Sequence, residues 1–207
     1  MKTNEVNIRD PYILVHDGKY YLYGTRSATT WGPADGFDCY VSTDLEEWEG
    51  PIEIFHRPEG FFADQCYWAP ECIFYKDAFY LITTLGAGDR KKGIYVLRSE
   101  QPTGPFEVYS GRLTPEDWAC IDGTVYFEQE MPVLIFSHSF EDCPDGDMCV
   151  VPLRGDLKEA AGEAVNLFSA VDAKWANPVP FAKDEFGLAG DVYFTEVQLV
   201  NKLEDGR

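Results

Sequence analysis

A pair of short apolar segments around a charged turn recurs along the chain, and this repeat constrains the fold more than any other feature. Residues 10–25 (DPYILVHDGKYYLYGT) align without a gap with residues 69–84 (APECIFYKDAFYLITT). A third copy begins at residues 121–137 (IDGTVYFEQEMPVLIFS), and a fourth at residues 195–207 (TEVQLVNKLEDGR). Apolar residues alternate on both sides of each turn, as in a two-stranded hairpin. The sequence therefore predicts a series of similar hairpins.

A second pattern lies between the copies and completes each unit. Residues 37–51, 93–108 and 148–168 each read as a strand, a polar turn and an outer strand. One unit then has about four strands over roughly 50 to 75 residues, which is the size of a propeller blade. We predict an all-β propeller domain over residues 1–207, with about three and a half blades in this chain. A ring of four units with a degenerate last blade is the alternative.

The composition agrees with an all-β domain and limits the classes of partner. Aromatic residues make up 15% of the chain, and 18 glycines and 13 prolines punctuate the apolar runs. The net charge of −19 argues against nucleic acid and against anionic membrane surfaces, because both bind through Lys and Arg. No run approaches the roughly 18 apolar residues of a membrane span. Neutral ligands such as sugars fit this charge, and so does an acidic surface that serves solubility alone.

The cysteines and the N-terminus indicate a cellular compartment. The six cysteines contain no CxxC pair, and the three histidines lie far apart, so a zinc cage is not predicted. Reduced, buried thiols are the expectation. No basic segment followed by an apolar stretch opens the chain, which predicts a cytoplasmic protein. Secretion stays open if the N-terminus is incomplete.

Three carboxylates stand at the starts of the repeated units. Asp10, Asp122 and Glu196 open copies one, three and four, and Ala69 occupies the aligned place in copy two. The first strand of each propeller blade lines the central channel, so these groups should converge at one end of the axis. Convergence raises at least one pKa, and a protonated acid beside an ionised base is what glycosidic cleavage requires. The alternative is that each acid is a solvated turn residue or strand cap.

The ordered blocks of this chain resemble those of glycoside hydrolase family 43. The blocks are RDPYILVHDGKYYLYGT, YWAPECIFYKDAFYLITT, CIDGTVYF and VYFTE, and they extend from Ile8 to Glu196. The resemblance implies a five-bladed β-propeller and an activity like that of β-xylosidases and α-L-arabinofuranosidases. It implies an oligosaccharide or polysaccharide substrate and an inverting mechanism. In that mechanism Asp10 would be the general base, Asp122 would tune and orient the acid, and Glu196 would be the general acid, with base and acid about 6.5–9.5 Å apart.

The resemblance also implies substrate contacts. Trp31 and Trp68 would stack on sugar rings, although core packing would account for either of them equally well. Glu71 belongs to the Trp-Ala-Pro-Glu block and is a further expected substrate contact. His138 in FSHSF resembles the family's channel histidine, which meets a central ion or water in some members, and a plain buried histidine is the alternative. No cofactor and no metal ligand is predicted, although some relatives hold a calcium ion in the channel.

Two departures and the end of the chain shape the alternative hypothesis. The family usually has Gly-Pro after the acid, where this chain has Val197-Gln198, and Pro after the middle Asp, where it has Gly123. The chain ends at Arg207, inside the fourth hairpin, so we expect a fragment of a longer propeller. An open blade edge could then pair with a second copy as a homodimer. The alternative function is an inactive or truncated carbohydrate-binding propeller that keeps the fold.

Overall fold

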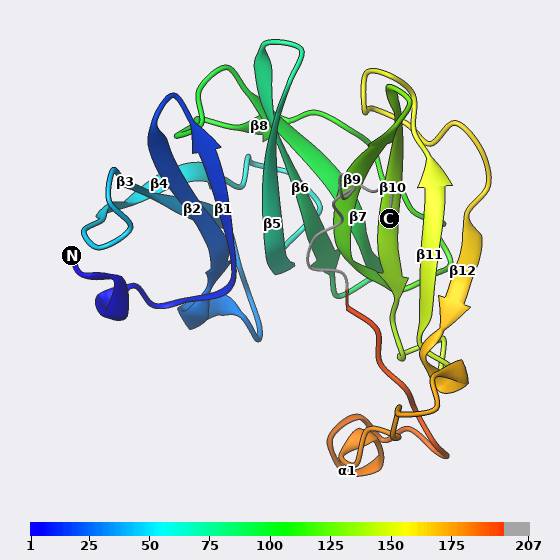
Figure 1. Ribbon diagram of the computed structural model, residues 1–207. Helices are drawn as coiled ribbons and strands as arrows, with labels where there is room; N and C mark the ends of the chain where they lie inside the picture. The colour runs from blue at the N-terminus through cyan, green and yellow to red at the C-terminus, as the bar shows by residue number, and fades with distance from the viewer. Residues whose placement is uncertain (197–207) are drawn as a thin grey trace.

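The computed structural model describes residues 1–196 (Figure 1), and its regular structure is almost entirely β. The strands are β1 (Ile8–His16), β2 (Lys19–Arg26), β3 (Gly36–Ser42), β4 (Glu49–His56), β5 (Gln65–Tyr75), β6 (Ala78–Ala87), β7 (Arg90–Ser99), β8 (Glu107–Val108), β9 (Cys120–Glu128), β10 (Met131–His138), β11 (Asp147–Pro152) and β12 (Val165–Ser169). The short helical segments are η1 (Thr3–Glu5), η2 (Ser27–Thr29), η3 (Ala170–Asp172) and α1 (Ala182–Phe186).

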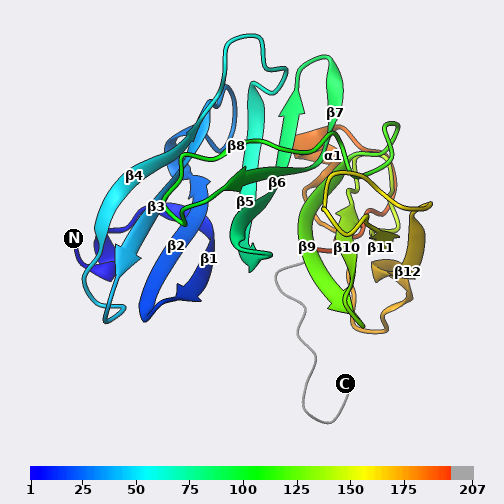
Figure 2. The ribbon, with the colours of Figure 1, turned by 90° about the horizontal axis from the view of Figure 1, so that it is seen from above.

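The strands form three four-stranded antiparallel sheets, each a simple meander. Their orders are β1-β2-β3-β4, β5-β6-β7-β8 and β9-β10-β11-β12. Figures 1 and 2 show the sheets side by side in an open arc, with β1, β5 and β9 on its inner side. The predicted all-β propeller blades are therefore confirmed for the first three units. The fourth predicted hairpin, residues 195–207, lies outside the described residues except for its first two.

The three inner hairpins share one turn geometry. Each turn has two central residues, and both have a left-handed backbone with φ between 46° and 72°. This is the type I′ turn, whose twist matches that of the flanking strands. Asp, Asn and Gly tolerate this conformation best. The three turns are Asp17-Gly18, Lys76-Asp77 and Gln129-Glu130.

The hydrophobic core lies between the sheets, and the middle sheet is covered on both faces. In β6, Leu81 packs into the core shared with the first sheet, whereas its neighbour Ile82 packs into the core shared with the third sheet. Both side chains are fully buried. Because successive strand residues point to opposite faces, a strand covered on both sides needs a continuous apolar run. The sequence of β6, AFYLITTLGA, has this character.

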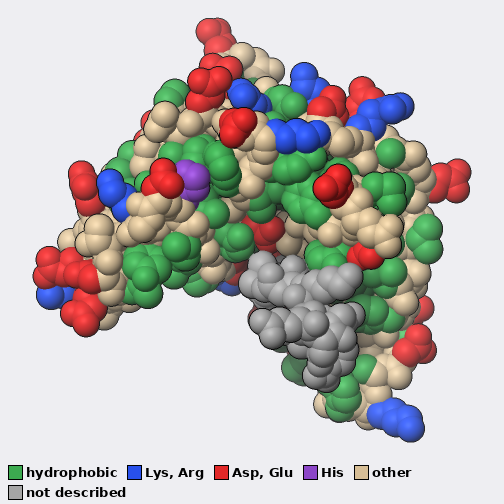
Figure 3. All heavy atoms as spheres, turned by 45° about the horizontal axis from the view of Figure 1, so that its top comes forward, with side chains coloured by type: hydrophobic (Ala, Val, Ile, Leu, Met, Phe, Trp, Pro, Cys, Tyr) green, Lys and Arg blue, Asp and Glu red, His purple; other side chains and the backbone are tan. Residues whose placement is uncertain are grey.

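The surface is acidic, as the net charge of −19 requires. Figure 3 shows Asp and Glu side chains along the rim of the visible face, with hydrophobic side chains between them. None of the helices in the described part of the chain has the length and apolar character needed to cross a membrane. All six cysteines are free thiols, in agreement with the expected reduced state.

Candidate active site

The innermost strand of each sheet is interrupted at the same place. Asp10 in β1, Ala69 in β5 and Asp122 in β9 have φ values of 50°, 43° and 54°. The regular pairing of each strand with its neighbour shifts at this point, as at a β-bulge. A left-handed backbone costs on the order of 1 kcal/mol for a residue with a side chain. The interruption thus falls at the aligned position of three consecutive blades, where the first and third blades have an aspartate and the second has Ala69.

A small cavity lies at this point of the axis. Its volume is about 30 Å³, which is room for one or two water molecules. All of its lining residues come from the innermost strands: Asp10, Pro11, Tyr12, Ala69, Pro70, Glu71, Asp122 and Gly123. The carboxylates of the first and third blades therefore face the same space, as the repeat alignment predicted.

Burial and neighbouring carboxylates raise the pKa of Asp122 and of Glu196. Burial is the largest cause of the raised pKa of Asp122, which reaches about 7, and the charges of Glu196 and Asp10 add to it. Burial also raises the pKa of Glu196, and the charge of Asp10 adds to that shift. Cations oppose both effects, namely Lys92 at Asp122 and Arg9 at Glu196. The structure thus brings Asp10, Asp122 and Glu196 within electrostatic reach of one another.

Hydroxyl groups on the second strands connect each blade to the next at this level. The Thr25 hydroxyl donates to Oδ2 of Asp10 at 2.9 Å and accepts the N–H of Ala69 at 2.9 Å. Thr84, at the aligned position in β6, accepts the N–H of Asp122 at 3.1 Å. Ser137 of β10 lies 2.8 Å from the hydroxyl of Thr195, the residue before Glu196. The sequence reasoning missed these groups, although Thr25 and Thr84 align in the repeat.

Glu71 lines the cavity from the second blade, but its carboxylate is already engaged. Its side chain is buried and accepts the hydroxyl of Thr124 at 2.9 Å and the N–H of Val125. Burial raises its pKa to about 7, and the two hydrogen bonds oppose that shift. Glu71 therefore joins β5 to β9 beside Asp122 and adds a further acidic proton to the site.

The two predicted tryptophans form an aromatic pair beside the carboxylates. The Trp31 and Trp68 rings meet edge to face, with centroids 5.4 Å apart. Trp31 is 72% exposed, so core packing does not explain it. Arg9 lies 5.2 Å from the centre of the Trp31 ring, and Lys92 lies 4.8 Å from that of Trp68. Arg9 also lowers the pKa of Glu196, and Lys92 lowers that of Asp122. The aromatic pair therefore borders the acidic site.

Gly123, which stands where the resembled family usually has Pro, is sterically required here. A Cβ atom at this position would lie 2.7 Å from Cγ2 of Ile94 and 3.0 Å from Cδ1 of Leu134. Contacts this short are not compatible with an added side chain unless the core moves. The glycine next to Asp122 thus lets β9 pack closely against Ile94 of the second blade.

The structure places His138 away from the axial cavity. His138 ends β10 and is not among the residues that line the cavity. Its ring stacks on Trp118 with centroids 4.2 Å apart and an interplanar angle of 2°. Its Nε2 lies 2.7 Å from Oδ1 of Asp142. His138 therefore belongs to a different group of side chains from Asp10 and Asp122.

Comparison with known proteins connects this geometry to a family. The sequence profile of the family described as "Glycosyl hydrolases family 43" matches residues 4–183. A solved endo-arabinase from Bacteroides thetaiotaomicron is 28% identical, with a TM-score of 0.85 over 99% of this chain and 69% of that one. A search of curated proteins found no match.

Two further solved structures are similar over a smaller share. A thermostable family-43 glycoside hydrolase is 26% identical, with a TM-score of 0.68 over 82% of this chain and 56% of that one. An endo-1,4-β-xylanase from Bacteroides thetaiotaomicron is 27% identical, with a TM-score of 0.57 over 77% of this chain and 52% of that one. This chain therefore spans between about half and about two thirds of the length of these proteins.

Proposed function

The chain belongs to the glycosyl hydrolases of family 43, and we propose that it hydrolyses arabinose- or xylose-containing glycans with inversion at the anomeric carbon. One observation carries this proposal: three carboxylates from different blades, Asp10, Asp122 and Glu196, lie within electrostatic reach of one another. Inverting hydrolysis needs one ionised and one protonated carboxyl group on opposite sides of the scissile bond.

Asp10 is suited to the role of general base. Its Oδ2 is held by the Thr25 hydroxyl, which leaves Oδ1 to accept a proton from water. As the water loses that proton, its oxygen forms the new bond to the anomeric carbon. The left-handed backbone at Asp10 keeps the carboxylate directed at the axis.

Glu196 is suited to the role of general acid, and Asp122 to that of its modulator. Its raised pKa favours the protonated form of the Glu196 carboxyl, which is the form that a general acid needs. The acid can then protonate the glycosidic oxygen as the bond to the anomeric carbon breaks. The charge of Glu196 raises the pKa of Asp122, so the two carboxyl groups are electrostatically coupled, as the role of a modulator requires.

The border of the site and the similar proteins support the proposed substrate class. Exposed Trp31 and its partner Trp68 offer aromatic faces and edges of the kind that pack against sugar rings. A strongly negative protein repels polyanions and admits neutral glycans. The similar structures include an endo-arabinase and an endo-1,4-β-xylanase, which supports pentose polymers as the first substrates to test.

The experiment is a hydrolysis assay on aryl α-L-arabinofuranoside, aryl β-D-xylopyranoside, linear arabinan and xylan. We expect turnover of at least one of them, and a fall in kcat of about 10²–10⁴-fold for Asp10→Asn and for Glu196→Gln. Asp17→Asn is the matched control, because Asp17 is an exposed turn residue with a similar backbone conformation. Unchanged turnover in Asp10→Asn would overturn the assignment. Binding of arabino-oligosaccharide without any hydrolysis would favour a carbohydrate-binding propeller.

A further inference from the structure

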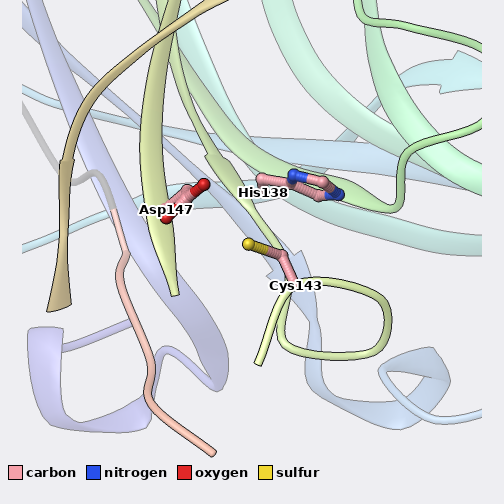
Figure 4. A group of neighbouring side chains, drawn as sticks. All are labelled: His138, Cys143 and Asp147. Carbon is pink, nitrogen blue, oxygen red and sulfur yellow. The ribbon is translucent and has the colours of Figure 1, made fainter. Parts of the chain in front are cut away.

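The loop between β10 and β11 gathers three groups that commonly bind transition metals. His138 ends β10, Cys143 lies in the loop, and Asp147 begins β11. A nitrogen, the sulfur and a carboxylate oxygen of these residues all lie within 4.8 Å of one another. Figure 4 shows the three side chains converging from their separate segments. Sequence reasoning did not predict a metal here, because the residues are spaced unlike any common zinc motif.

The imidazole of His138 is already held in place. Trp118 stacks on one of its faces, and Asp142 lies 2.7 Å from Nε2. With Nε2 directed at the Asp142 carboxylate, Nδ1 is the ring nitrogen left to act as a ligand atom. Asp142 is itself fixed, because its Oδ2 accepts the N–H of Ala119 at 2.9 Å and also contacts Lys91. A carboxylate behind a histidine is the usual support of a metal-binding imidazole.

The loop also prepares Cys143 and Asp147. The backbone N–H of Gly146 donates to the carbonyl oxygen of Cys143 at 3.0 Å, which closes the turn after the cysteine. Gly146 has a φ of 66°, and a Cβ there would lie 2.7 Å from the carbonyl oxygen of Tyr193, so the turn is closely packed. Oδ1 of Asp147 accepts the Ser169 hydroxyl, which leaves Oδ2 free. The loop sequence EDCPDGD is strongly acidic, which favours a cation.

We propose that His138, Cys143 and Asp147 form a binding site for a divalent ion of the zinc class, with water as the fourth ligand. Thiolate, imidazole and carboxylate together suit Zn²⁺, whereas Ca²⁺ takes oxygen ligands only. Ligands around tetrahedral zinc lie about 3.3–3.8 Å apart, so the group must contract by about 1 Å. Binding releases the thiol proton to solvent, because the thiolate is the ligand.

An ion at this site would also fix the segment that leads to Glu196. Tyr193 donates its N–H to the carbonyl of Pro144 at 2.7 Å, and the Thr195 hydroxyl donates to the carbonyl of Asp147 at 3.2 Å. The loop between β10 and β11 thus forms hydrogen bonds with Tyr193 and Thr195, which lie shortly before Glu196 in the chain. This consequence for catalysis rests on the proposed function, whereas the metal site itself does not.

The test is a titration of the chelator-treated full chain with Co²⁺, followed by competition with Zn²⁺. We expect one ion per chain, a sulfur-to-cobalt charge-transfer band in the near ultraviolet, and loss of the band when Zn²⁺ is added. Cys143→Ser and His138→Gln should abolish the band, and Cys66→Ser should keep it, because Cys66 is a partly buried thiol outside the group. No band in the parent, or a band that persists in Cys143→Ser, overturns the proposal.

A second measurement uses the parent chain alone and so does not depend on how the variants fold. Zn²⁺ should slow the alkylation of Cys143 by iodoacetamide at least tenfold, as read by peptide mass spectrometry, while Cys66 reacts at its metal-free rate. Equal alkylation of Cys143 with and without Zn²⁺ contradicts the site. Activity is read separately, so a chain that binds Zn²⁺ but hydrolyses no glycan would contradict only the proposed function.

Discussion

At the scale of single residues, the site depends on side chains held in a costly backbone conformation. Asp10 and Asp122 adopt a left-handed φ next to a break in strand pairing. Asp and Asn tolerate this conformation better than other residues with side chains. Asn can therefore replace either aspartate without disturbing the backbone, so each substitution isolates the effect of the negative charge.

The raised pKa of Asp122 predicts a pH-dependent gain in stability for Asp122→Asn. The pKa is about 7 in the folded chain against a reference of 3.8, so the folded state binds more protons between these values. The parent therefore loses stability as pH rises from about 4 to 7. We expect the variant's advantage in urea unfolding to grow over this window, reaching on the order of 2–4 kcal/mol at pH 8. Asp17→Asn should show no such growth, and an advantage that shrinks with rising pH would contradict the assignment.

Arg9 predicts the position of the basic limb of the activity profile. Its positive charge lowers the pKa of Glu196, so Arg9→Gln should let the acid keep its proton to higher pH. We expect the basic limb of kcat/KM to move to higher pH in Arg9→Gln. Lys19→Gln, a change on the exposed end of β2, is the control. A downward shift in Arg9→Gln would show that Glu196 is not the acid.

At the scale of elements, the inner strands are joined by hydroxyl groups on the second strands. Thr25 is 1% exposed and binds the Asp10 carboxylate and the Ala69 N–H at once. Thr84 repeats the contact to the backbone of Asp122 in the next blade. The contacts set the angle at which successive blades present their first strands to the axis.

Thr25→Val is predicted to lower both stability and kcat. The substitution leaves the Ala69 N–H without a partner, which costs about 1–3 kcal/mol, and frees the Asp10 carboxylate to rotate. We expect kcat to fall at least tenfold with KM nearly unchanged, because Thr25 acts through Asp10. Thr25→Ser keeps the hydroxyl and should restore most of kcat. A rise in KM at unchanged kcat would assign Thr25 to substrate binding instead.

The strands and hairpins were predictable from the sequence because their patterns are local. Alternating apolar residues and a two-residue turn specify an inner hairpin, and the aligned Asp10 and Asp122 indicate which residues face the axis. The contact between Thr25 and Ala69 was not predictable in the same way, because it depends on how two blades pack. The group around His138 depends on a loop conformation that no repeat encodes.

At the scale of the whole molecule, three blades form an open arc whose inner strands share one axis (Figure 2). The apolar faces pack between blades, so the core holds the inner strands in place, and the acidic groups collect where those strands meet the axis. Catalysis belongs to this scale, because Asp10 and Glu196 lie at opposite ends of the described chain and meet only through the arrangement of blades.

The most direct test of the account is the configuration of the first sugar released from an arabino- or xylo-oligosaccharide, read by ¹H NMR before mutarotation. A base that activates water and a separate acid predict a product whose anomeric configuration is opposite to that of the substrate. A product that retains the substrate's configuration would contradict the roles assigned to Asp10 and Glu196.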